Sequence, residues 1–119
     1  MAHQATGIAR SQQNASNLAG LARFFPESAP LRLPVHLTRT PEGTGAPDFS
    51  ESTVIEFGTS REVLFTCKAH LDFADELRVQ NVDGSFDEMV SVVAVQYHPG
   101  NTYVAARFRR DVPNWIVKS

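Results

Sequence analysis

The residues that could carry metal, nucleophilic or acid–base chemistry are scattered along this 119-residue chain. Metal-binding histidines usually occur in short, regular spacings. The histidines of this chain show no such spacing, because they stand at His3, His36, His70 and His98. Cys67 could form a thiolate beside Lys68 and His70, but a small buried thiol is the simpler interpretation. We therefore expect no metal, no cofactor and no enzymatic activity.

Acidic residues gather beside the turns that the sequence predicts. Paired carboxylates can transfer protons in an active site, but on short edge strands they more simply keep the sheet soluble. We favour the second role for this set, which comprises Asp72, Asp75, Glu76, Asp87 and Glu88.

A basic cluster near the end of the chain raises the alternative of nucleic-acid binding. Arg107, Arg109 and Arg110 follow Tyr103, and small barrels can bind single strands through basic residues and aromatic rings. However, the chain has a net charge of −2 and a pI near 6.0, so it has no general attraction for phosphate backbones. The same arginines could contact an acidic partner protein or form a solvated face.

Length and composition set the remaining bounds. A chain of 119 residues with 42% hydrophobic residues is expected to form one globular domain. A single cysteine excludes a disulfide within the chain, and we find neither a signal peptide nor an apolar run long enough to cross a bilayer. These features predict a cytoplasmic protein without a membrane segment.

Six segments have the β-branched and aromatic composition of strands. Leu31, Leu33, Val35 and Leu37 alternate with polar residues, and Asp83-Gly84 is a strong hairpin signal. Because closure removes exposed edges, we predict an all-β fold, a small six-stranded antiparallel β-barrel. Trp115 is expected to plug one end of it. The predicted strands are 31–38, 52–57, 62–67, 76–82, 89–97 and 103–109.

The first 22 residues differ in composition from the rest. They are rich in Ala, Gln, Asn, Ser and Gly, which bury too little apolar surface to offset chain ordering. We predict a mobile N-terminal arm over residues 1–22 and a barrel domain over residues 23–119, with a short helical turn against a partner at residues 17–25 as the alternative. Phe24 and Phe25 would either anchor a partner or cap the open end of the barrel. The exposed loop at 41–50 is a second candidate partner surface.

The order of these elements resembles the PilZ domain. The resemblance rests on Leu-Arg-Leu-Pro-Val at 31–35, Val-Leu-Phe at 63–65 after a bend, a polar hairpin, Val-Val-Ala-Val at 92–95, and Tyr-Val-Ala-Ala-Arg-Phe at 103–108. It extends over roughly residues 23–117. PilZ domains are bacterial regulatory modules that bind cyclic di-GMP.

The resemblance also implies where a ligand would bind. In the family, an RxxxR segment before the first strand and a D/N-x-S-x-x-G segment at the bend between the second and third strands hold the nucleotide. Here the second segment falls on Phe57, Thr59 and Glu62, and only the hydroxyl of Thr59 keeps the pattern. The first falls near Phe24 and Ser28, with Arg23 one residue out of register.

Three hypotheses follow from these departures. In the first, the chain is a non-canonical PilZ-like regulatory module that acts through a protein partner. In the second, cyclic di-GMP still binds through a rearranged set, namely Arg23, Arg32, Thr59 and Ser60, although an unpaired Glu62 would repel its phosphates. In the third, the chain is a small nucleic-acid-binding barrel, which the acidic balance disfavours.

Overall fold

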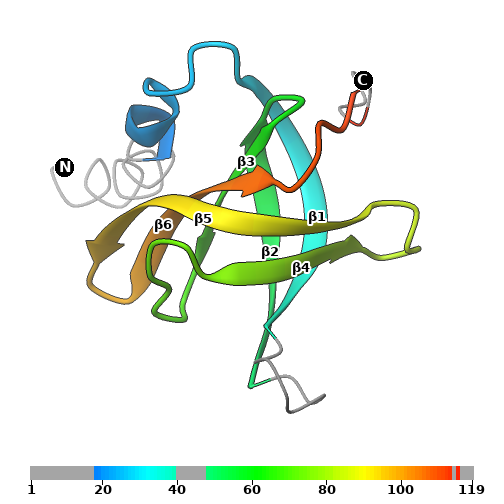
Figure 1. The fold of residues 1–119 in the computed structure, drawn as a ribbon. Coiled ribbons are helices and arrows are strands. Elements are labelled where there is room, and N and C mark those ends of the chain that lie inside the picture. Colours follow the sequence, from blue (N-terminus) through cyan, green and yellow to red (C-terminus); the bar gives the residue numbers. More distant parts are fainter. Residues whose placement is uncertain (1–17, 40–47, 114, 116–119) are drawn as a thin grey trace, which may run out of the picture.

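The structure, a computed structural model, describes residues 18–39, 48–113 and 115. Six antiparallel strands form a closed barrel in the order β1-β2-β3-β6-β5-β4, with β4 pairing back onto β1 (Figure 1). The predicted fold class is confirmed. The strands are β1 (Ala29–Arg39), β2 (Phe49–Gly58), β3 (Glu62–Cys67), β4 (Glu76–Asn81), β5 (Asp87–His98) and β6 (Asn101–Phe108).

The barrel interior is filled by alternate side chains of the strands, as a period of two requires. Val35 and Leu37 of β1 point inward, as do Val63 and Phe65 of β3, and all are at most 4% exposed. Leu77, Val79, Val90, Val92 and Val104 belong to the same interior cluster and are all 0% exposed. Complete burial of these apolar side chains is the main source of barrel stability.

β1 has β4 as a neighbour along only part of its length. β1 pairs with β2 along its length but with β4 only from Val35 to Thr38. Pro30 and Pro34 lie in the part of β1 that has no β4 neighbour, and neither can donate a ladder hydrogen bond. The two prolines therefore hinder the unpaired edge of β1 from pairing with a strand of another molecule.

β5, like β3 and β6, packs on both of its faces. A register shift between Val92 and Ala94 turns Val93 and Ala94 outward, while Val90 and Val92 remain in the interior. This irregularity lets an outer apolar cluster form on the wall made by β3, β6 and β5. Its buried members are Leu18, Leu21, Ala22, Leu64, Tyr103 and Ala105.

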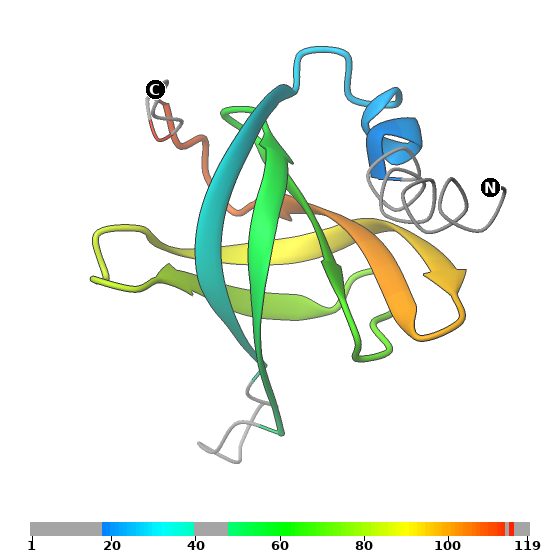
Figure 2. The same ribbon diagram turned by 180° about the vertical axis from the view of Figure 1, so that it is seen from behind.

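A helical turn at residues 18–22 covers that outer cluster (Figure 2). Leu18 and Leu21 are 0% and 2% exposed, because the spacing Leu18, Leu21, Ala22 places all three on one helical face. This corrects the predicted arm at its C-terminal end, where residues 18–22 pack against the barrel. Residues 1–17 of that arm lie outside the described residues.

Aromatic rings fill the end of the barrel beside the C-terminal segment. Trp115 lies with its ring centroid 5.1 Å from that of Phe86 and 5.6 Å from that of Phe108. Phe25 instead packs against the outer cluster, and Phe24 is 73% exposed. Phe24 and Phe25 thus do not cap the barrel, because Trp115 already occupies the position.

Candidate functional site

The bend between β2 and β3 is held together by the hydroxyl of Thr59. Its Oγ1 atom accepts hydrogen bonds from the backbone N–H groups of Arg61 and Glu62, both at 2.8 Å. The same hydroxyl donates to Oε1 of Glu62 at 2.7 Å. A threonine that binds its own following backbone is a common way to close a turn, so this residue acts as an internal clamp.

Glu62 is buried and paired, contrary to the expectation that it would stand unpaired before a ligand. It is 8% exposed. Arg107 lies opposite it in the β3–β6 register and donates from Nε and Nη2 to its Oε2 atom, at 3.1 and 3.0 Å. A carboxylate held by a guanidinium and a hydroxyl is compensated for its loss of water. Glu62 is therefore a paired residue of the barrel wall, where β3 meets β6.

The C-terminal segment fixes the other side of the same bend. The indole Nε1 of Trp115 donates to the carbonyl oxygen of Thr59 at 2.6 Å, and the N–H of Val112 donates to that of Ser60 at 2.8 Å. Gly58 lies against the six-membered ring of Trp115, where a Cβ atom would overlap the ring. The polar groups of the bend are thus largely bonded to the protein itself.

A hollow of about 300 Å³ opens between this bend and the segment that precedes β1. The resemblance to PilZ domains implies a ligand at this place, and Thr59 and Ser60 do line it. Arg23 and Arg32 are exposed but do not line it. The lining residues are Phe24, Phe25, Pro26, Glu27, Thr59, Ser60, Arg61, Glu62 and Arg107.

The arginines that line this hollow are Arg61, which the sequence does not single out, and Arg107, which it places in the basic cluster but not at the bend. Both also line a second hollow of about 330 Å³, together with the residues at 108–111. Arg61 follows directly after Ser60, so its place at the bend could have been predicted. Arg107 could not, because only the pairing of β3 with β6 brings it to Glu62.

Each arginine of the second hollow has a carboxylate partner. Arg107 pairs with Glu62, Arg109 with Glu76, and Arg110 with Glu88 at 2.9 Å. Arg61 is the loosest, since its Nε atom lies 3.7 Å from Oδ1 of Asp111, too far for a hydrogen bond. Four exposed arginines are thus each paired with a carboxylate, which is largely buried for Glu62 and Glu88 and exposed for Glu76 and Asp111.

Tyr103 does not belong to this arginine cluster. It is 2% exposed in the outer cluster beneath the helical turn, and its ring stacks on that of His98 at 4.1 Å. Single-strand binding by barrels relies on exposed rings on which bases stack. The expected grouping of Tyr103 with the arginines is therefore wrong.

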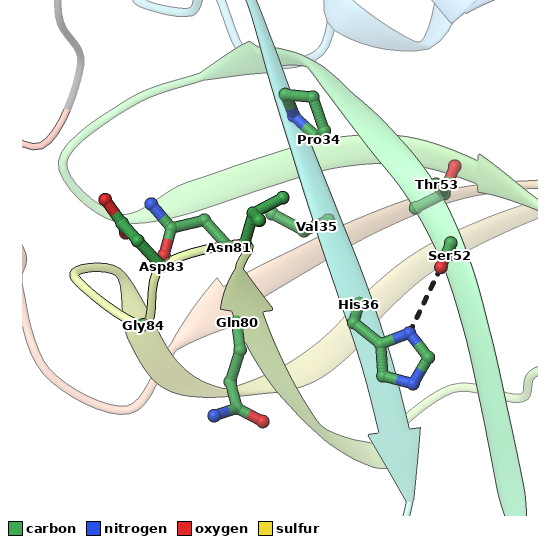
Figure 3. Close-up of a pocket in the computed structure, with 10 residues that line it drawn as sticks. Pro34, Val35, His36, Ser52, Thr53, Gln80, Asn81, Asp83 and Gly84 are labelled. Carbon is green, nitrogen blue, oxygen red and sulfur yellow. Dashed lines mark hydrogen bonds between the residues drawn. The ribbon is translucent and has the colours of Figure 1, made fainter.

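A larger pocket of about 470 Å³ lies on the other side, where β1 parts from β4 (Figure 3). His36 and Ser52 point toward one another across β1 and β2, and Nε2 of His36 also lies 2.6 Å from Oγ of Ser50. Asn81 accepts a hydrogen bond from the N–H of Phe86, and Asp83 from that of Ser85. These polar side chains therefore hydrogen-bond within the protein itself, His36 between β1 and β2, and Asn81 and Asp83 within the β4–β5 hairpin.

The sequence also raises Cys67, His70 and Asp72 as reactive groups, and the structure places all three outside these hollows. Burial raises the pKa of the Cys67 thiol to about 12, so it stays protonated at neutral pH. His70 stacks on Tyr97 and lies 3.2 Å from Asp72, all at the surface. Among residues 18–39, 48–113 and 115, no group of three or more His, Cys, Asp or Glu residues could hold a metal ion.

Comparison with models of known protein families and with curated protein sequences finds no match for this chain. Among the described residues, no helix has the length and apolar character needed to cross a membrane. Most of the predicted partner loop, residues 41–47, lies outside the described residues.

Proposed function

We propose that this chain is a PilZ-like regulatory module of bacterial cyclic di-GMP signalling that acts by contacting a protein partner rather than by binding the nucleotide itself. The proposal starts from the closed six-stranded barrel and from the sequence resemblance in the order of its strands. The barrel alone carries no function, so the argument depends on the bend between β2 and β3.

One observation supports a protein partner over direct nucleotide binding. The Thr59–Glu62–Arg107 network occupies the bend, and its hydroxyl, carboxylate and guanidinium bond to one another. A dianionic nucleotide placed there would meet the carboxylate of Glu62 and would have to compete with it for Arg107. Separating a buried carboxylate from its guanidinium is costly because the charge is left uncompensated.

A second candidate function is direct binding of cyclic di-GMP by a different arginine set. It is favoured by the positions of Arg61 and Arg107, which line the hollow beside the bend where Arg23 and Arg32 do not. Guanidinium groups bind phosphates and guanine edges well. Under this second candidate the wild type should bind cyclic di-GMP, whereas under the proposal it should not.

Calorimetric titration of the full chain with cyclic di-GMP tests the proposal. We expect no heat of binding from the wild type at micromolar ligand. A Ser28→Arg, Phe57→Asp, Glu62→Gly variant, which moves both segments toward the family pattern, is expected to bind.

Heat in the wild type that is lost in Arg61→Gln would favour the second candidate and contradict the proposal. Arg32→Gln is the matched control, because Arg32 is an exposed arginine outside the hollow. Silence in both the wild type and the family-like variant would contradict the resemblance itself.

A further inference from the structure

The two hollows beside the bend share two lining residues, and we call the surface that they make together the arginine groove. It is made of residues 24–27, 59–62 and 107–111, and the two halves share Arg61 and Arg107. One half is bounded by Phe24 and the bend, and the other by the end of β6 and the residues that follow it. The groove therefore offers an aromatic end and a basic end.

Two ion pairs of the groove are arranged in depth. The side chains of Glu62 and Glu88 are only 10% and 14% exposed, whereas those of their partners Arg107 and Arg110 are 55% and 74% exposed. In these two pairs the carboxylate lies beneath the guanidinium group, whereas Asp111 and Glu76 are about as exposed as their partners Arg61 and Arg109. The ion pairs also use only part of the N–H donors that each guanidinium carries.

Arg61 is the best-placed anchor for an incoming anion. Its side chain is 68% exposed and has no hydrogen bond to its neighbour Asp111, 3.7 Å away. A pair so exposed and so long is weak, so a carboxylate from another molecule could replace Asp111 at little cost. Arg61 lines both halves of the groove, which places this anchor at its centre.

Phe24 supplies the apolar contact at the other end. Its backbone is fixed, since its N–H donates to the carbonyl oxygen of Leu21 at 3.1 Å, and the adjacent Phe25 packs against the outer cluster. The ring nevertheless stays 73% exposed. An exposed ring on a well-anchored segment is pre-organised for contact, so little ordering entropy is lost on binding.

We propose that the arginine groove binds an acidic segment of a partner protein, with a carboxylate on Arg61 and an apolar side chain on Phe24. This inference depends on the proposed function as a protein-interaction module and names the chemistry of the partner. A peptide fits better than a nucleic acid, because Tyr103 lies buried away from the groove and Phe24 is the one ring lining it that is mostly exposed.

A titration of the isotope-labelled full chain followed by backbone amide NMR shifts tests this inference. The probe is the blocked peptide Asp-Glu-Asp-Phe-Glu-Asp-Gly. We expect shifts at residues 60–62 and 108–111 and at Phe24. Arg61→Gln and Phe24→Ser should each weaken binding about tenfold, while Arg32→Gln should leave it unchanged. Both substituted residues are exposed, so the barrel should stay folded in each variant.

Two control probes test whether binding requires carboxylates and whether a nucleic acid can replace the peptide. The same peptide with Asn and Gln in place of Asp and Glu should not bind, and neither should a hexathymidylate strand. Equal binding of the amide peptide, equal loss in Arg32→Gln, or binding of the oligonucleotide but not of the acidic peptide would each overturn the inference. The outcome is separate from the nucleotide titration, because cyclic di-GMP binding by the wild type would contradict the proposed function whatever the peptide does.

Discussion

The β2–β3 bend and the β4–β5 hairpin are two short connections closed by similar chemistry. In the bend, Thr59 accepts hydrogen bonds from two backbone N–H groups. In the hairpin, Asn81 and Asp83 each accept one, from Phe86 and Ser85. Both connections satisfy their own backbone with small polar side chains.

The two connections differ in what they contact beyond the turn. The bend is covered by Trp115 and joined through Glu62 to Arg107, while the hairpin points away from the barrel and its Val82 is 93% exposed (Figure 1). The bend is therefore bonded to β6 and to the C-terminal segment, whereas the hairpin is exposed at Val82 and packs on the barrel end only through Phe86. Substitutions in the β2–β3 bend should therefore destabilise the fold more than substitutions at the tip of the β4–β5 hairpin.

Exchanging a glycine in each turn should give the largest difference between the two regions. Gly58→Ala places a methyl group into the ring of Trp115, and we expect a loss of about 2–3 kcal/mol in the free energy of unfolding from overpacking. Gly84→Ala meets no atom within 4 Å but imposes a side chain at φ +77°, so we expect about 1 kcal/mol. Urea denaturation measures both.

The origin of the Gly58 effect can be checked with Trp115→Ala. Removing the ring should destabilise the barrel, but the added cost of Gly58→Ala should then largely disappear, because the methyl group has space. A Gly58→Ala cost that is the same in both backgrounds would show that the ring is not the cause. Gly84→Ala should cost the same in either background.

Acid should act on the hairpin through Asp87, in a smaller effect. The hydrogen bond from Arg78 lowers the pKa of Asp87 below its ordinary 3.8. A carboxyl with a lower pKa in the folded state stabilises the fold above pH 3.8 and loses that contribution as the pH falls through the folded value. Asp87→Asn should therefore flatten the fall in the urea midpoint between about pH 5 and about pH 2.5. An unchanged slope would mean that this pair contributes nothing.

The sequence predicts the hairpin better than the bend, and the reason is physical. Asp83-Gly84 is a local signal, and alternation locates the strands, with β3 predicted at its observed bounds and β1 and β5 a few residues short. The sequence favours a mobile arm over a short helical turn at residues 17–25, because Leu18, Leu21 and Ala22 stand in a polar stretch and find their apolar contacts only on the closed barrel. Glu62 and Arg107 are neighbours through strand pairing alone.

The same distinction applies to the candidate site. Thr59 and Ser60 could be placed from the bend itself, and both line the hollow. Arg23 and Arg32 were chosen by residue type near β1, but neither lines it, since their positions along the backbone turn them elsewhere. Arginines near a site in sequence are thus a weak guide until the register of the strands is known.

A double-mutant cycle on Glu62 and Arg107 tests most directly the central claim that the bend is closed by its own residues. The variants are Glu62→Gln, Arg107→Met and their combination, and the measurement is the free energy of unfolding in urea. We predict a coupling energy of about 1–2 kcal/mol, because a largely buried carboxylate is left without its guanidinium in the Arg107→Met variant. A coupling energy near zero would contradict the claim and leave Glu62 and Arg107 available to a ligand.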